Sequence, residues 1–272
     1  MSVTHPPASS SGSGSDAGTN AGLYAPHPRG IWDCGTCFAG GSSATSILPA
    51  GALATDQIQS LTSWIAATDT SGGGGGSANG STQIVQTPSM SGAARAFTTT
   101  FSNSGDERYA VTFGEDTAST HFLYDGWIYI ADPSAAIANL EMDMNQVLAN
   151  GQTVIFGFQC DGYSGTWDYT ENAGTPEAPV DEWVHSAAAC NPRSWQPDVW
   201  HQVQISYQRD DAGNVTYNTV WLDGSEQPLN VTVPSAFALG WGSTLLTNFQ
   251  VDGLGSGGSS TVYLDNLTVF RW

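Results

Sequence analysis

The sequence predicts an all-β protein, built as a sandwich or a barrel. Thirty-two glycines and thirteen prolines in 272 residues favour turns over helices. From about Arg95 to Trp272, short segments of alternating apolar and polar residues are separated by Gly, Asn and Asp, which is typical of antiparallel strands. Ten Trp, nine Tyr and ten Phe can fill a sheet core and still leave rings on the surface.

Composition divides the chain into a disordered Ser/Gly/Pro-rich head at 1–30, a mostly irregular N-terminal appendage at 31–82 and a β-sandwich at 83–272. Within the appendage, Ile58, Leu61 and Ile65 recur at helical spacing and predict a short helix over 55–67. The glycine run 72–76 predicts a flexible linker.

Strand-like alternation recurs through the rest of the chain. The predicted strands are 95–101, 109–114, 120–130, 137–146, 152–160, 166–170, 200–209, 214–223, 228–233, 245–252 and 260–271. The run Asp210 to Asn214 reads as a hairpin turn between two of these strands.

Within 137–146, polar and apolar residues alternate most regularly. Leu140, Met142 and Met144 would enter the core, because successive side chains of a strand point to opposite faces. Glu141 and Asp143 would then stand side by side on the other face. Such a carboxylate pair indicates either a sugar-binding surface or an acid–base site.

Two more strands carry polar and aromatic side chains on one face. The outward residues of 121–130 include His121, Asp125 and Trp127, and those of 200–208 include Gln204. We expect these residues to join Glu141 and Asp143 on one concave sheet face that binds a glycan, since rings stack on sugars while amides and carboxylates bind hydroxyls. The predicted binding set is His121, Asp125, Trp127, Gln146, Trp167 and Gln204.

The charge restricts the class of partner. The chain has six Arg, no Lys and twenty-five acidic residues, for a formal net charge of −19. Such a charge excludes nucleic acid as a partner and disfavours anionic polysaccharides, so a neutral polysaccharide or a metal cation is expected. No apolar run approaches the ~20 residues of a membrane span, and no signal peptide is visible. Composition and cysteines together still favour an extracellular protein.

Four cysteines form two candidate pairs. Cys160 and Cys190 are expected to form a disulfide that closes the segment 161–189, read as a long loop. Cys34 and Cys37 form a Cys-x-x-Cys motif, for which a local disulfide is expected, because a redox motif needs a βαβ context. A zinc site formed by all four cysteines remains an alternative.

Three segments resemble a known superfamily. Trp200 to Ile205 with Trp221 to Gly224 resembles the Trp-His-x-Val and Asp-Gly hairpin of laminin-G and concanavalin-like jelly rolls. Glu141 to Gln146 is similar to the catalytic strand of laminarinase and lichenase glycoside hydrolases, and Val262 to Leu267 resembles their final strand. The resemblance covers about 95–272 and implies an all-β, concanavalin-like jelly-roll β-sandwich.

The same resemblance implies roles for single residues. Glu141 would be the nucleophile and Asp143 its helper, while Asp265 would contribute to a structural Ca²⁺ site. The third carboxylate of the catalytic strand is missing, because Asn145 and Gln146 stand where the acid is needed. A catalytic reading therefore needs a displaced acid, for which the candidates are Asp125, Asp168, Glu171 and His121.

The sequence therefore favours an extracellular glycan-binding module for a neutral polysaccharide. The first alternative is a glycoside hydrolase that uses Glu141 and Asp143 with a displaced acid. The second is a polysaccharide lyase, in which Gln146, His121 and Tyr124 would serve as neutraliser, base and acid.

Overall fold

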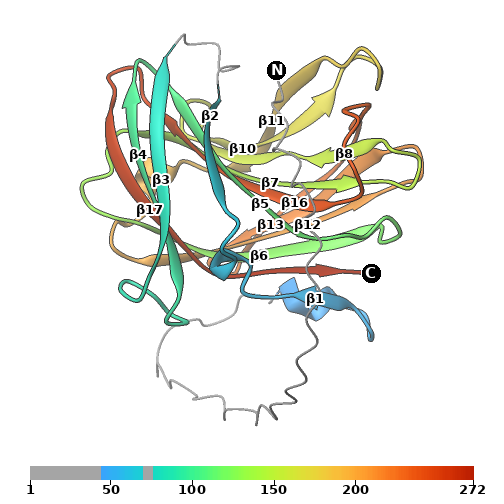
Figure 1. Ribbon diagram of the computed structural model, residues 1–272, viewed down its shortest axis with the longest axis horizontal. Helices are drawn as coiled ribbons and strands as arrows, with labels where there is room; N and C mark the ends of the chain where they lie inside the picture. Colours follow the sequence, from blue (N-terminus) through green and yellow to red (C-terminus); the bar gives the residue numbers. More distant parts are fainter. Residues whose placement is uncertain (1–43, 70–75) are drawn as a thin grey trace, which may run out of the picture. The chain divides into compact units, whose positions relative to one another are not determined.

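The computed structural model describes residues 44–69 and 76–272, which form a sandwich of two antiparallel β-sheets. Figure 1 shows the strands of the two layers. The prediction of an all-β sandwich is confirmed. In the described part of the chain no helix has the length and apolar composition to cross a membrane.

The strands are β1 Leu53–Thr55, β2 Ile65–Asp69, β3 Ser77–Val85, β4 Ala94–Ser102, β5 Asp106–Gly114, β6 His121–Ile130, β7 Ile137–Val147, β8 Thr153–Phe156, β9 Phe158–Asp161, β10 Thr166–Asn172, β11 Asp181–Ala189, β12 Trp200–Arg209, β13 Asn214–Leu222, β14 Ser225–Pro234, β15 Ala236–Phe237, β16 Leu245–Gly253 and β17 Gly258–Arg271. Three short 3-10 helices accompany them, η1 Ala44–Ile47, η2 Ile58–Ser60 and η3 Pro192–Ser194.

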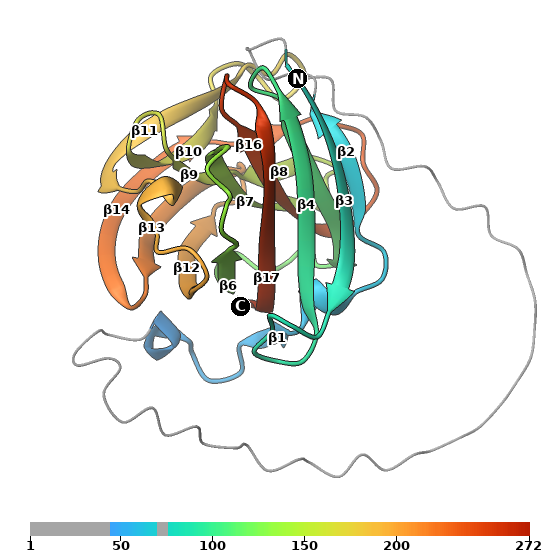
Figure 2. The same ribbon diagram turned by 90° about the vertical axis from the view of Figure 1, so that its left-hand side faces the viewer.

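Each sheet mixes strands from distant parts of the chain. Sheet 1 has the order β14-β13-β12-β6-β17-β4-β3, with β1 paired to β17. Sheet 2 has the order β11-β10-β9-β7-β16-β5-β2, with β8 paired to β7 and β15 paired to β8. Figure 2 shows β6, β17, β4 and β3 of sheet 1 running side by side.

The core lies between the inner faces of the sheets. Phe122, Tyr124 and Ile128 of β6 are fully buried there, as are Leu140 and Met142 of β7. Burying one large apolar side chain contributes roughly 1.5–3 kcal/mol, so the alternation along each strand fixes which face turns inward. The alternation predicted for 139–145 is therefore present.

Every strand predicted from Arg95 onward is present, with small differences at the ends. The predicted strand 152–160 is interrupted at Gly157 and forms β8 and β9. A side chain at Gly157 would collide with Thr170 of the adjacent strand, with a Cβ only 2.5 Å from Thr170 Cγ2. The predicted hairpin turn joins β12 to β13, and Asp210 accepts hydrogen bonds from the N–H groups of Ala212 and Asn214.

The helix predicted over 55–67 is wrong. The segment contains the end of β1, the turn η2 and the start of β2. Ile58 is buried but Ile65 is 46% exposed, so the apolar spacing does not mark one helical face. Sheet pairing decides the structure instead, because β1 pairs with β17 and β2 pairs with β5.

The region 31–82 is thus not an appendage in its described part, since it supplies β1, β2 and most of β3 to the two sheets. Residues 1–43 and 70–75 lie outside the described residues. They include the predicted disordered head, Cys34, Cys37 and most of the glycine run.

The Cys160–Cys190 disulfide is confirmed, with a Cα–Cα distance of 5.2 Å. The segment that it closes is not a loop, because 161–189 contains β10 and the whole of β11. β11 is an edge strand with only part of its residues buried, so its apolar pattern is too weak to predict.

Candidate functional site

The carboxylates of β7 stand on the outer face of sheet 2. Glu141 and Asp143 are 7% and 9% exposed, although the core-facing side of β7 is formed by Leu140, Met142 and Met144. In the neighbouring strand β16, Gln250 lies opposite Glu141, Asn248 opposite Asp143 and Asp252 opposite Asn139. We call these six polar residues of β7 and β16 the carboxylate row.

Hydrogen bonds link the members of the carboxylate row. Gln250 Nε2 donates to Glu141 Oε1 at 2.7 Å and to Asp252 Oδ1 at 3.0 Å. Asn139 Nδ2 donates to Asp252 Oδ2 at 3.3 Å. The amides thus hold two carboxyl groups side by side on adjacent strands.

Asp252 differs chemically from an ordinary surface carboxylate. Burial and the nearby charge of Asp106 raise the pKa of Asp252 well above its usual range, while its side-chain hydrogen bonds with Gln250, Asn139 and Glu141 oppose that shift. The Asp252–Glu141 pair therefore holds a proton over a wider pH range than a free carboxyl does. Closely spaced carboxyl groups behave in this way because both cannot ionise freely.

Asp143 has a structural role as well. Its Oδ1 accepts the backbone N–H of Phe158 at 3.0 Å, next to the interruption at Gly157. Its backbone carbonyl accepts the Thr247 hydroxyl at 2.7 Å. Asp143 thus stabilises the joint between β8 and β9 in addition to lining the outer face.

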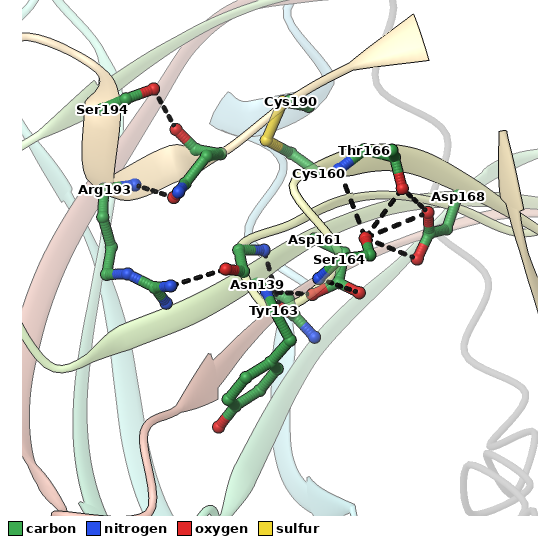
Figure 3. Close-up of a disulfide and its surroundings, with 12 residues drawn as sticks. Asn139, Cys160, Asp161, Tyr163, Ser164, Thr166, Asp168, Cys190, Arg193 and Ser194 are labelled. Carbon is green, nitrogen blue, oxygen red and sulfur yellow. Dashed lines mark hydrogen bonds between the residues drawn. A yellow bond between two sulfur atoms is a disulfide. The ribbon is translucent and has the colours of Figure 1, made fainter. Parts of the chain in front are cut away.

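Beyond β7, the same face continues onto β9, β10 and β11. Asp161 lies opposite Asn139, and Asp168 faces His185 across the β10–β11 pair. Figure 3 shows Asp161 and Asp168 on the same hairpin, with hydrogen bonds to the intervening Tyr163, Ser164 and Thr166.

The Asp168 carboxylate makes most of the hydrogen bonds in this part of the outer face, where β9, β10 and β11 are neighbours. His185 Nδ1 lies 2.8 Å from Asp168 Oδ2, and the Thr166 hydroxyl donates to Asp168 Oδ1 at 2.6 Å. Burial raises the pKa of Asp168, hydrogen bonds from Thr166 and His185 lower it, and the nearby Asp161 carboxyl raises it. The hydrogen bond to Asp168 in turn raises the pKa of His185.

Two aromatic residues flank this polar face. Trp183 is half-buried on β11 and lies on the same side of the strand as His185, two residues away. Tyr163, in the turn between β9 and β10, is 61% exposed. Neither ring was predicted as a binding residue from the sequence.

Four of the predicted binding residues lie on the opposite sheet, namely His121, Asp125, Trp127 and Gln204. Asp125 and Trp127 stand on the outer face of β6 in sheet 1. Asp125 accepts hydrogen bonds from Gln202 at 2.8 Å and Gln204 at 2.9 Å. The prediction that these residues share one face with Glu141 and Asp143 is wrong, because the outer faces of a sandwich point in opposite directions.

His121 also belongs to sheet 1, where it begins β6. Its ring stacks on Trp272 with centroids 5.5 Å apart, and its Nδ1 lies 2.9 Å from the Thr120 hydroxyl. His121 thus belongs to sheet 1, whereas the carboxylate row lies on β7 and β16 of sheet 2. The lyase reading also needs Gln146 and Tyr124 to reach a substrate, but both side chains are fully buried.

The structure contradicts a sugar contact for Trp167 and for Gln146. Trp167 is fully buried and stacks on Phe158 with ring centroids 5.2 Å apart. Gln146 is also fully buried, and its amide donates to the carbonyls of Asp116 and Ser119 and accepts from Arg209 Nε at 2.7 Å. Both residues therefore stabilise the fold.

Asp265 does not fit the predicted Ca²⁺ site. Its carboxylate accepts the backbone N–H groups of Met90, Ser91 and Asn266, and in addition the two serine hydroxyls of Ser89 and Ser91 and the Gln59 amide. Burial raises the pKa of Asp265, but these hydrogen bonds lower it below the usual value. Since backbone donors cannot turn away, the carboxylate anchors the 89–91 loop to β17.

A separate pocket of about 350 Å³ opens beside the disulfide. His201 and Asp223 line it, with His201 Nδ1 2.7 Å from Asp223 Oδ2. His201 Nε2 also lies 3.1 Å from the Gln196 carbonyl. Because both ring nitrogens face acceptors, His201 is held as a donor and is unsuited to act as a general base.

The sequence contained a pattern that could have predicted the site residues of β16. Asn248, Gln250 and Asp252 alternate with Phe249 and Val251 in the predicted strand 245–252. This is the same pattern as in 139–145, and it places three polar side chains on one face. The residues of β7 do not specify which strand pairs with it, so the carboxylate row could not be predicted from the sequence.

No family model matches the sequence, and no curated protein matches it. Several solved structures are similar in fold. A structure of carbohydrate-binding modules from the β-sandwich superfamily has a TM-score of 0.40 and 10% identity, covering 78% of this chain and 58% of that chain.

Two further similar structures come from other kinds of protein. The carbohydrate esterase of the Shiga toxin-encoding bacteriophage phi24B has a TM-score of 0.45 and 13% identity, covering 81% of this chain and 99% of that chain. Lectin II from Ulex europaeus has a TM-score of 0.40 and 11% identity, covering 80% and 97%. Likeness at these levels assigns neither a family nor a function to this chain.

Proposed function

We propose that this protein is extracellular and binds a neutral glycan along the outer face of sheet 2. The carboxylate row carries the proposal, because Glu141, Gln250 and Asp252 form a continuous line of hydrogen-bonding groups across two central strands. Sugar hydroxyls both donate and accept hydrogen bonds, and a mixture of carboxylates and amides serves both needs.

Charge supports a neutral ligand. The chain has a formal net charge of −19, and Glu141 and Asp143 lie on the proposed face. An anionic polysaccharide would be repelled from such a surface, whereas neutral hydroxyl groups donate to it. The disulfide supports an extracellular location, since disulfides persist in oxidising compartments.

The test of this proposal compares two half-buried tryptophans on opposite sheets, Trp183 and Trp127. A glycan array would identify a ligand, and calorimetry would measure its affinity for each Trp→Ala variant. We expect Trp183→Ala to weaken binding roughly tenfold, the equivalent of about 1.4 kcal/mol from a lost ring contact.

Trp127→Ala is the matched control and should leave the affinity within about twofold. The opposite ranking would place the glycan on sheet 1, where Asp125 and Gln204 lie beside Trp127. If no neutral glycan binds, the proposed function is wrong.

A second candidate function is glycoside hydrolysis, and Asp252 favours it. The catalytic reading of β7 lacks a proton donor, and Asp252 is a buried carboxyl with a raised pKa beside Glu141. In this reading Asp252 gives its proton to the glycosidic oxygen, while the Glu141 carboxylate acts at the anomeric carbon or through a water molecule. Asp252 was not among the predicted displaced acids.

Measuring the release of reducing ends from neutral polysaccharides tests this second function. We expect Asp252→Asn and Glu141→Gln each to reduce turnover by about 10²-fold or more, the usual contribution of a positioned acid or base. Asp125→Asn is the control, because Asp125 lies on the opposite sheet. If the unmodified protein binds a glycan but releases no reducing ends from it, the binding function stands and hydrolysis of that glycan is excluded.

A further inference from the structure

One corner of sheet 2 brings together three groups that bind metals. Asp161 at the end of β9, Asp168 on β10 and His185 on β11 offer two carboxylate oxygens and an imidazole nitrogen, all within 4.8 Å of one another. Both carboxyl groups are buried, with exposed fractions of 5% for Asp161 and 0% for Asp168. A buried pair of carboxylates requires compensation by a cation or a proton.

A second observation points to a ligand at the same place. Gln159 is 4% exposed, and its amide nitrogen lies 3.5 Å from Asp168 Oδ2. Its Oε1 is buried and has no hydrogen-bond partner among the described residues. A half-turn of the amide directs this oxygen at the cluster, where a bound cation would satisfy it.

The hydrogen bonds of Asp168 are also reversible. All of its partners are side-chain groups, namely the Thr166 and Ser164 hydroxyls, the Gln159 amide, the His185 ring and the Asp161 carboxyl. Hydroxyls and amides can turn, and the ring can give up its proton. Asp161 accepts one backbone N–H group at each oxygen, from Tyr163 and Ser164, so each oxygen keeps a lone pair for an ion. Asp265 differs in this respect, since its two oxygens accept six hydrogen bonds and leave no lone pair free.

We propose that the Asp161–Asp168–His185 cluster binds a divalent transition-metal cation of the Zn²⁺ class. A mixed set of oxygen and imidazole ligands suits Zn²⁺, whereas Ca²⁺ and Mg²⁺ prefer oxygen alone. Ligand atoms around a tetrahedral Zn²⁺ lie about 3.3–3.6 Å apart. Because the three ligand atoms lie within 4.8 Å of one another, side-chain movements of about 1 Å would close the site around the ion. The His185 side chain is 64% exposed, which leaves a route for the ion.

Calorimetric titration with ZnCl₂ tests the site. Every protein would carry Cys34→Ser and Cys37→Ser, so that neither cysteine competes for the ion in any redox state. We expect one saturable site in this background and a loss of affinity of at least about tenfold in His185→Gln, which removes a ligand from an exposed position. Asp168→Asn should weaken binding too, with its folded state checked by thermal unfolding.

Glu182→Gln is the matched control, because Glu182 is an exposed acid on β11 three residues before His185. It removes one negative charge nearby but no ligand, so the affinity should change less than about twofold. Excess CaCl₂ should not displace Zn²⁺. The proposal is overturned if Zn²⁺ shows no saturable site, if His185→Gln and Glu182→Gln bind equally, or if Ca²⁺ competes effectively. Glycan binding is measured separately and does not enter this test.

Discussion

At the scale of single residues, the His201–Asp223 pair shows how environment sets protonation. Burial lowers the pKa of His201, but hydrogen bonds to Asp223 and to the Gln196 carbonyl outweigh burial and hold the pKa above its usual value. Asp223 also accepts the backbone N–H of Gln202 at 2.8 Å. The stability of the β12–β13 hairpin therefore depends on whether the His201 imidazole is charged.

This pair predicts a pH-dependent contribution to stability. Since the pKa of His201 is higher in the folded than in the unfolded protein, its contribution is complete below the unfolded value of about 6.5 and is lost as pH rises through the folded value. We expect Asp223→Asn to be less stable than the unmodified protein by roughly 1–2 kcal/mol at pH 6, with a smaller difference at pH 8.5.

Urea unfolding at several pH values measures that difference. Asn is a suitable replacement, because Asp223 has a positive φ of 51°, which Asn tolerates well. A stability difference that stays constant from pH 6 to pH 8.5 would contradict a charged His201.

The contacts of single residues also restrict the functional interpretation of the alternating pattern in 137–146. The alternation in 137–146 correctly places Glu141 and Asp143 on one face, opposite Leu140, Met142 and Met144. It does not reveal that Asp143 completes a backbone hydrogen bond to Phe158 or that Gln146 is fully buried. Those facts depend on neighbours that are distant in sequence.

At the scale of elements, the disulfide joins the end of β9 to the residue after β11. Cys160 and Cys190 are separated by 30 residues, and the enclosed segment forms the β10–β11 hairpin. The hairpin carries Asp168, His185 and Trp183, so the disulfide restricts the part of sheet 2 on which both proposals rest.

Removing the disulfide should destabilise the protein. The chain-entropy model predicts about 3–4 kcal/mol for a closed loop of this length. We expect Cys160→Ala with Cys190→Ala to lower the free energy of unfolding by about 3 kcal/mol in guanidinium titrations; alanine avoids burying two hydroxyl groups.

A reductant provides the control for that measurement. It should lower the unfolding midpoint of the unmodified protein more than that of the double variant, since both retain Cys34 and Cys37. A loss below about 1 kcal/mol would show that the hairpin is held by sheet pairing alone.

The elements that sequence missed share a physical cause. β2 and β11 lie at the ends of sheet 2 and β3 lies at one end of sheet 1, while β1 and β15 each pair with a single strand. Ile65 in β2 and Val180 beside β11 are exposed. Edge strands bury only part of their side chains, so their alternation is weak. β7 and β16 are central, and their alternation follows the burial of their inner faces closely.

At the scale of the whole molecule, the division of strands between two sheets decides the candidate site. β6 and β12 are neighbours in sheet 1, which brings Asp125, Trp127 and Gln204 together as expected. β7 pairs with β16 and β9 in sheet 2, so Glu141 acquires Gln250 and Asp252 as partners instead. The proposed glycan face and the proposed metal cluster consequently belong to the same sheet.

The sequence by itself determined the all-β class, the central strands, the core-facing sides of β6, β7 and β12 and the Cys160–Cys190 pairing. These features depend on local alternation, turn residues and cysteine count. Only the tertiary structure decided which strands are neighbours, and hence that Asp252 joins Glu141 while Trp127 lies on the far side. The physical reason is that strand pairing is set by burial and backbone hydrogen bonds between distant segments, which the pattern within one strand does not specify.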